Sequence, residues 1–145
     1  MPAAPTPTPA PTPAPTPHGL ILFAHGARDP AWAQPLHELA RLVAQRNSAL
    51  AVRVAFLELQ PPGLSAALDE LAVTCTHITV LPVFWAAAGH VAQELPALLA
   101  SARTRHPALT LKALPPLSEL PGLLAFVADA AVAAALIPIR IGNEN

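Results

Sequence analysis

Four runs of apolar residues recur along the chain, each followed by a segment of helical character. The runs span residues 19–24, 51–57, 77–84 and 108–114. They are nearly continuously apolar, whereas a strand with one solvated face alternates apolar and polar positions. Continuous runs indicate strands covered on both faces, and strands that alternate with helices indicate a parallel sheet. The pattern therefore predicts an α/β fold with three layers, in which a four-stranded parallel sheet carries helices on both faces.

Proline and glycine mark the expected ends of the helices between these runs. We expect helices over residues 31–45, 64–73 and 121–136, and a further helix that ends near Arg105. In that further helix we expect Pro96 in the first turn, where its missing N–H does no harm, and His90 on a turn before it. Pro82 lies inside the third apolar run and predicts a short or irregular strand end, because proline cannot donate to the sheet.

Composition divides the chain into a tail and a single domain. Residues 1–17 alternate proline with alanine and threonine, which favours extended polyproline II and leaves nothing to bury. We therefore expect a disordered tail over 1–17, one α/β domain over 18–140 and a short tail over 141–145. The chain is 53% hydrophobic with a net charge of −1. It has ample material for a core and no basic surface for nucleic acid.

Two further features limit the class of protein. Cys75 is the only cysteine, which excludes an internal disulfide or a multi-cysteine metal centre within one chain, and we expect it to be buried. The most apolar segment, residues 123–139, contains Asp129 and Pro138 and falls short of the roughly 20 apolar residues that span a bilayer. The tail over 1–17 lacks the basic start and apolar core of a secretory signal. We expect no membrane partner and, by default, a cytoplasmic protein.

Three polar residues follow three of the apolar runs at nearly equal intervals. They are His25, Glu58 and His90, separated by 33 and 32 residues. One strand–helix–strand unit takes about 30 residues, so the three recur at the same point of successive units. That point is the carboxyl end of each strand, where open parallel sheets bind ligands. Two imidazoles and a carboxylate at this edge predict a divalent-metal site.

Each of these residues has an ordinary structural interpretation when it is taken alone. His25 could simply bond to its own loop, Glu58 could form a salt bridge or cap a helix, and His90 could contact solvent at a helix start. The other histidines, at positions 18, 37, 77 and 106, fit surface or capping roles. The shared position of the three at one sheet edge favours the metal site.

Residues near this edge are candidates for holding a substrate. Arg28 follows the first turn and can pair with substrate carboxylates, and Trp85 can form an apolar wall for a flat ligand. Gly89 ends a loop of small residues that leaves room for a bulky ligand. Neighbouring Asp29 and Phe84 fit ordinary roles better, as a helix cap and a core residue respectively.

Several familiar chemistries lack their motifs here. The chain has no G-x-x-x-x-G-K-[ST] segment, no G-x-G-x-x-G after the first strand and no G-x-S-x-G turn. A P-loop ATPase, a dinucleotide-binding enzyme of the common type and an α/β-hydrolase are therefore not indicated. The His25–Gly26 pair is faintly similar to phosphohistidine enzymes, but Ala24 stands where they have arginine.

Three segments together resemble the CbiX/SirB family of ATP-independent sirohydrochlorin chelatases. They are LFAHGARDP (22–30), AFLE (55–58) and LPVFWAAAGHV (81–91), and the resemblance extends from about Gly19 to Leu136. It implies the chelatase fold and insertion of Co²⁺, toward cobalamin, or Fe²⁺, toward sirohaem, into a tetrapyrrole. The metal would be a co-substrate, with no permanently bound cofactor. The missing P-loop agrees with an ATP-independent member.

The resemblance also implies roles for individual residues. His25 and His90 match the family's two histidines and would hold the metal beside the macrocycle, and Glu58 matches its acidic residue and would coordinate or take up pyrrole protons. Ala27 departs from the serine that the family commonly has after the first His-Gly. The chain resembles the short, single-domain form, which pairs as a homodimer to build its cleft.

Two other functions remain open on the sequence alone. A non-catalytic carrier of metal or tetrapyrrole would need the two histidines but not Glu58. An inactive subunit that completes the cleft of a partner would tolerate the loss of His25, Glu58 and His90. The apolar last helix could contribute to a dimer interface or could be buried in the core.

Overall fold

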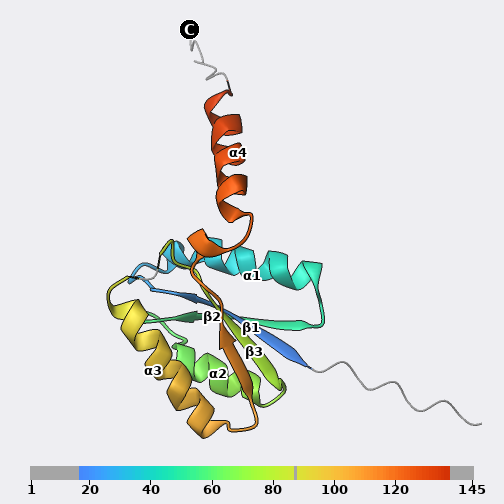
Figure 1. The fold of residues 1–145 in the computed structure, drawn as a ribbon, viewed down its shortest axis with the longest axis vertical. Coiled ribbons are helices and arrows are strands. Elements are labelled where there is room, and N and C mark those ends of the chain that lie inside the picture. Colours follow the sequence, from blue (N-terminus) through green and yellow to red (C-terminus); the bar gives the residue numbers. More distant parts are fainter. Residues whose placement is uncertain (1–16, 87, 138–145) are drawn as a thin grey trace, which may run out of the picture.

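The computed structural model describes residues 17–86 and 88–137, so most of the two expected tails lies outside the described residues. The strands are β1 (His18–Ala24), β2 (Leu50–Phe56), β3 (His77–Pro82) and β4 (Thr110–Ala113). The helices are α1 (Gln34–Arg46), α2 (Leu64–Ala72), α3 (His90–Arg105) and α4 (Leu123–Ala135). Two short 3-10 helices, η1 (Pro30–Ala33) and η2 (Leu117–Glu119), precede α1 and α4. Figure 1 shows their arrangement.

The four strands form one parallel sheet in the order β2-β1-β3-β4. The central strand β1 pairs along its whole length with β2, from His18 opposite Leu50 to Ala24 opposite Phe56. Strand order changes direction at β1, because β2 lies on one side of it and β3 on the other. Ligands bind at such switch points in open α/β sheets. The predicted four-stranded parallel α/β fold is confirmed.

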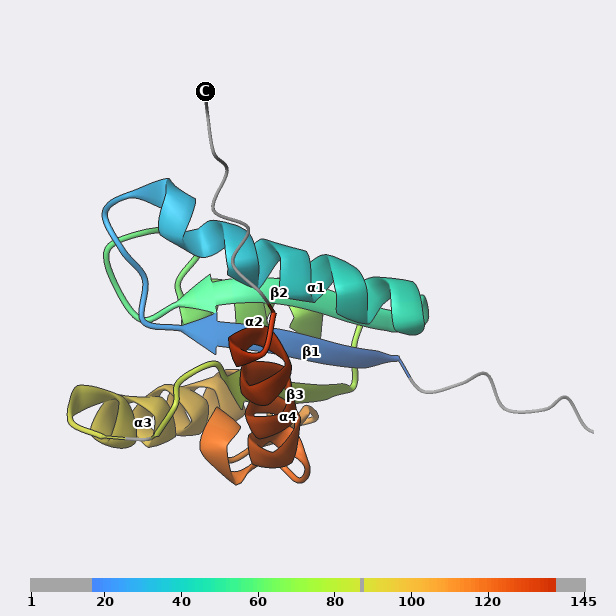
Figure 2. The ribbon, with the colours of Figure 1, turned by 90° about the horizontal axis from the view of Figure 1, so that it is seen from above.

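Helices cover the two faces of the sheet unequally. Helices α2 and α3 pack against one face, and α1 packs against the other over β1 and β2 (Figures 1 and 2). Odd-numbered residues of β1, such as Ile21 and Phe23, enter the larger core beneath α2 and α3. Leu22, between them, enters the smaller core beneath α1. Strand β1 is therefore covered on both faces, which explains its continuous apolar run, whereas β3 and β4 are buried mainly on the face beneath α2 and α3.

Helix α4 does not take part in either core. It projects away from the sheet on the side of α1, and none of its residues is buried (Figure 1). The sequence left open whether this helix would be buried in the core or exposed for an interface. The structure does not bury α4 in the core of its own domain, so the first of these alternatives is wrong.

Two prolines behave differently from each other. Strand β3 ends at Pro82, in line with the predicted shortening of the third apolar run. The expected positions of Pro96 and His90 are both wrong. Helix α3 begins at His90 itself, six residues before Pro96, and contains Pro96 in its interior. The ring removes one helical N–H at that point. The turns around it nevertheless stay helical, because Val91, Leu99 and Ala102 anchor α3 to the core.

Cys75 is 5% exposed and lines the larger core, as expected. Among the described residues, no helix is long and apolar enough to cross a membrane.

Candidate functional site

The loops that follow β1 and β2 are bonded side by side at the carboxyl edge of the sheet. Beyond the last strand residues, the N–H of Leu57 donates to the carbonyl of Ala24 at 2.9 Å. The N–H of Glu58 donates to the carbonyl of His25 at 3.0 Å. The parallel pairing thus continues for one step past each strand. It places His25 and Glu58 next to each other by backbone geometry rather than by side-chain contact alone.

Gly26 is required where these two loops meet. Its φ of +97° lies in the region that side chains rarely adopt. A Cβ at this position would lie 2.0 Å from the backbone oxygen of Glu58. Glycine at position 26 therefore permits both the tight turn and the close approach of the two loop backbones.

The side chains of His25 and Glu58 contact each other. His25 Nε2 lies 3.2 Å from Glu58 Oε1, and the two side chains are 52% and 57% exposed. The other ring nitrogen, Nδ1, lies 3.3 Å from the carbonyl of Gly26. The carboxylate and the carbonyl orient the imidazole, while half of each side chain stays open to solvent. A cation or a substrate can therefore reach the pair from outside.

His90 does not join this pair. It is the first residue of α3, exposed, and it follows Gly89, whose φ is +62°. Within the described residues, no three histidine, cysteine or acidic side chains group closely enough to hold a metal ion. The structure thus brings together two of the three expected ligands. His90 is set apart because the chain continues through a loop after β3 before α3 begins on the opposite face of the sheet from α1.

The three candidate substrate residues lie around the same edge. Arg28 is exposed on the loop after β1. Trp85 is 57% exposed, and its backbone carbonyl accepts a hydrogen bond from the N–H of Ser118 at 3.1 Å. A Cβ at Gly89 would meet nothing within 4 Å, so its left-handed φ rather than crowding favours glycine there.

Two neighbours have the ordinary roles expected of them. Asp29 caps η1, because its Oδ1 accepts a hydrogen bond from the N–H of Ala31 at 2.9 Å. Phe84 packs edge to face against Phe23 of β1, with ring centroids 5.8 Å apart, and belongs to the core.

Two residues near the site were not anticipated from the sequence. Gln60 accepts a hydrogen bond at Oε1 from the N–H of Ala27 at 3.1 Å, which ties the two loops together beyond the His25–Glu58 pair. Trp32 on η1 is 78% exposed. Both line a hollow of about 150 Å³ beside the pair, together with Ala24, Gly26, Ala27, Ala33, Leu36 and Phe56. A tryptophan two residues after Pro30, close to the predicted site, was a signal in the sequence, whereas the Gln60 contact depends on the fold.

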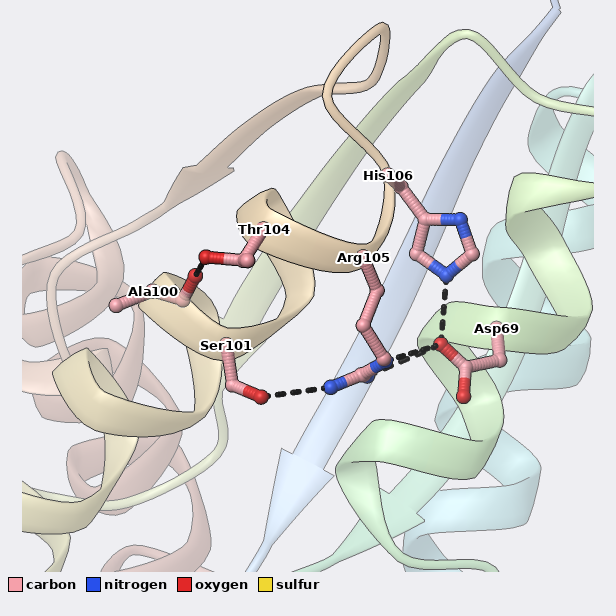
Figure 3. Close-up of polar contacts among 6 residues, drawn as sticks. All are labelled: Asp69, Ala100, Ser101, Thr104, Arg105 and His106. Atoms are coloured by element: carbon pink, nitrogen blue, oxygen red, sulfur yellow. Dashed lines mark hydrogen bonds and ion pairs between the residues drawn. The ribbon is translucent and has the colours of Figure 1, made fainter.

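A second polar cluster, away from the candidate site, joins α2 to the end of α3. Arg105 Nε and Nη2 donate to Asp69 Oδ1 at 3.2 and 3.0 Å, and His106 Nε2 lies 2.7 Å from the same oxygen (Figure 3). The contact with His106, followed by that with Arg105, holds the pKa of the Asp69 carboxyl below its usual value. This cluster lies at the amino edge of the sheet, so its role is structural.

The family comparison matches most of the chain. A family model described as CbiX matches residues 19–134. A sirohydrochlorin cobaltochelatase of Methanosarcina acetivorans is 32% identical over 82 residues, which cover 56% of this chain and 63% of that protein. The sirohydrochlorin cobaltochelatase of Methanosarcina barkeri is 29% identical over the same lengths. The matched region of this chain therefore spans less than two thirds of these curated relatives.

Solved structures share the fold. A putative cobalamin biosynthesis CbiX protein of Marinobacter aquaeolei has a TM-score of 0.70 at 27% identity, covering 82% of this chain and 98% of that one. The sirohydrochlorin chelatase SirB of Bacillus subtilis subspecies spizizenii, in complex with cobalt, has a TM-score of 0.62 at 25% identity. That match covers 69% of this chain and 43% of SirB.

Proposed function

Because this chain belongs to the CbiX family, we propose that it inserts a divalent cation, Co²⁺ or Fe²⁺, into a sirohydrochlorin-type tetrapyrrole. Curated relatives named sirohydrochlorin cobaltochelatase support this substrate class, and the cobalt complex of a similar chelatase supports the metal. The cation is a co-substrate in this reaction, and no resident cofactor is invoked.

The observation that carries the proposal is the His25–Glu58 pair. Consider two ligand atoms that each lie about 2.1 Å from one cation. If the angle that they subtend at the cation is between a right angle and the tetrahedral value, they lie roughly 3.0–3.4 Å apart. The separation between His25 Nε2 and Glu58 Oε1 is 3.2 Å. A cation can therefore bind between them with little movement of either side chain. A nitrogen and a carboxylate oxygen suit both Co²⁺ and Fe²⁺.

Glu58 has a second task in the proposed reaction. Two pyrrole N–H bonds must break as the cation enters, and two protons leave the macrocycle. A carboxylate in contact with the entering metal can accept such a proton. Because Glu58 is 57% exposed, it can pass the proton on to water. Glu58 thus serves first as a ligand and then as a base.

The remaining candidates form the surroundings of the macrocycle. Arg28, exposed on the loop after β1, would pair with acidic groups of the substrate, and the exposed ring of Trp85 would offer a flat apolar contact. Trp32, which lines the hollow beside the pair, would offer a second such ring. In this proposal His90 supplies the second imidazole after a movement that brings the start of α3 toward the pair.

One observation favours a second candidate function. His90 stands apart from the pair, and a two-ligand site holds a cation more weakly than a three-ligand site. This arrangement suits a carrier that releases its metal, or a subunit that completes its site with a partner. A carrier does not need Glu58 as a base, so the two functions differ in their response to Glu58→Gln.

The test is the visible spectrum of sirohydrochlorin mixed with the full chain and Co²⁺, repeated with Fe²⁺. We expect insertion faster than the spontaneous rate, abolished by His25→Ala and slowed by Glu58→Gln by about 10²–10⁴-fold, as for loss of a general base. His37→Ala and Glu38→Gln, exposed on α1, are matched controls that keep the full rate. Insertion no faster than the spontaneous rate, with metal binding retained in Glu58→Gln, would favour the carrier.

A further inference from the structure

Two histidines lie next to each other at the amino edge of the sheet, the edge opposite the candidate site. His18 begins β1 and His77 begins β3, and the parallel pairing places the two residues directly opposite each other. Their ring centroids are 5.0 Å apart, with an angle of 30° between the ring planes. Each histidine alone fits a surface role, and only the strand register shows them as a pair.

Both side chains belong to the face of the sheet that carries α1. Side chains alternate between the two faces of a strand, and Leu22 and Leu81, which lie an even number of positions after His18 and His77, pack beneath α1. A hollow of about 260 Å³ lies beside the pair, lined by His18, His77, Ile78, Thr79, Thr110 and Lys112. No carboxylate is among these lining residues. A ligand in this hollow therefore meets two imidazoles, two hydroxyls and one ammonium group.

Thr76 orients one of the two rings. Its Oγ1 lies 3.0 Å from His77 Nδ1. The backbone of Thr76 is itself held in place, because its N–H donates to the carbonyl of Pro17 at 3.2 Å and its carbonyl accepts from the N–H of Thr110 at 2.9 Å. When Nδ1 keeps its proton and donates it to Thr76 Oγ1, the lone pair of Nε2 stays available for a ligand. Histidines that bind metals are oriented by a hydrogen bond of this kind.

The separation of the rings fits two imidazoles on one cation. If each nitrogen lies about 2.1 Å from the cation, the two ring centres lie roughly 4.6–5.3 Å apart for angles between a right angle and the tetrahedral value. The observed separation of 5.0 Å falls within this range. Each ring needs only to turn one nitrogen toward the cation, because the strand register already sets the distance between the side chains.

The groups around the hollow select the kind of cation. Imidazole suits Co²⁺, Ni²⁺, Cu²⁺ and Zn²⁺, whereas Mg²⁺ and Ca²⁺ need several oxygen ligands. The hydroxyls of Thr79 and Thr110 can bond to the waters that complete the coordination. The exposed Lys112 can extend its ammonium group into solvent, so it weakens the attraction for a cation without closing the site.

We propose that His18 and His77 form a second site for a divalent transition-metal cation, at the edge of the sheet opposite His25 and Glu58. The two sites cannot share one ion, because the length of β1 separates them by roughly 20 Å at about 3.3 Å per residue. A cation at the second site joins β1 to β3 at the first residue of each strand. It therefore stabilises the folded chain, since the unfolded chain does not hold the two rings together. The inference is independent of the proposed chelatase activity.

The first test is a calorimetric titration of Ni²⁺ into the full chain carrying His25→Ala, which removes a ligand of the other site. We expect one Ni²⁺ per chain and no binding of Mg²⁺. His18→Gln and His77→Gln should each weaken Ni²⁺ binding by about a hundredfold or more, and Thr76→Val by about 10–100-fold. His37→Gln, exposed on α1, is the matched control and should leave the affinity unchanged. Ni²⁺ binding that survives both His18→Gln and His77→Gln would overturn the proposal.

The second test distinguishes a cation from an anion in the same hollow. Lys112→Gln should leave the affinity for Ni²⁺ unchanged or raise it, because a positive charge is removed. An anion site would instead bind inorganic phosphate and lose it in Lys112→Gln, and that result without Ni²⁺ binding would contradict the proposal. In the His25→Ala chain, saturating Ni²⁺ should also raise Tm, and adding His18→Gln should remove this rise.

Discussion

Gly26 is the residue on which the candidate site depends most directly. Any larger residue would bring Cβ into the backbone of Glu58 and would strain a φ of +97°. Gly26→Ala should therefore lower the free energy of unfolding by roughly 2–4 kcal/mol. It should also separate His25 from Glu58 and reduce metal insertion. Chemical denaturation and the spectroscopic insertion assay measure the two effects.

Gly63 provides a matched control for this substitution. Its φ is −72°, and a Cβ there would meet nothing within 4 Å. Gly63→Ala should therefore change the free energy of unfolding by less than about 1 kcal/mol. Equal effects of the two substitutions would show that the loops after β1 and β2 are not in the close contact described.

Residue-level predictions from the sequence succeeded where a local rule applies. Asp29 before Pro30 is a capping signal, and its role as a helix cap is confirmed. The contact of Gln60 with Ala27 joins residues 33 apart, and no local rule identifies it. The grouping of His25 with Glu58 follows from parallel strand pairing, whereas the position of His90 depends on the path of a loop.

At the scale of elements, the Asp69 cluster links α2 to α3 and makes stability depend on pH. The folded-state pKa of Asp69 is lowered by His106 and then by Arg105. Its stabilising effect is therefore full above the unfolded pKa of about 3.9 and is lost as pH falls through the folded value. Because the side chain is 47% exposed, Asp69→Asn should cost no more than about 1 kcal/mol at neutral pH.

The measurement for Asp69 is the free energy of unfolding at neutral and acidic pH. The difference between the native chain and Asp69→Asn should shrink as the pH falls below about 4, because both then carry an uncharged group. Glu94→Gln, an exposed substitution on α3, should change neither value. A difference that stays constant into acid would mean that Asp69 acts by packing and not by charge.

Strands were easier to predict than helices in this chain. Each apolar run became a strand, and the signal is most continuous in β1, whose residues pack into the cores on both faces of the sheet. Pro96 was placed wrongly, because a local preference of proline for the first helical turn was outweighed by the core contacts of α3. The exposure of α4 could not be predicted, since an all-apolar helix carries no periodic pattern to show which face packs or against what.

At the scale of the whole molecule, the stability of one copy should come from its closed core, because no residue of α4 is buried. Leu68 is fully buried beneath the sheet, and Leu68→Ala should cost about 2–5 kcal/mol in the free energy of unfolding. Phe126 is 69% exposed within one copy, so Phe126→Asp should leave the stability of the isolated copy nearly unchanged. Denaturation at low protein concentration, where copies are separate, should show this contrast.

The homodimer that the family resemblance implies would make the melting temperature depend on protein concentration. A dimer that dissociates as it unfolds gains stability by mass action, so each tenfold increase in concentration should raise Tm by roughly 2–4 °C. Phe126→Asp should abolish this dependence, while Val73→Asp should keep it, because only Phe126 lies on α4. Helix α4 also follows η2, which is bonded to the backbone of Trp85 beside the candidate site. If dimerisation positions η2, Phe126→Asp should weaken tetrapyrrole binding as well as association. A Tm of the native chain that does not depend on concentration would contradict both expectations.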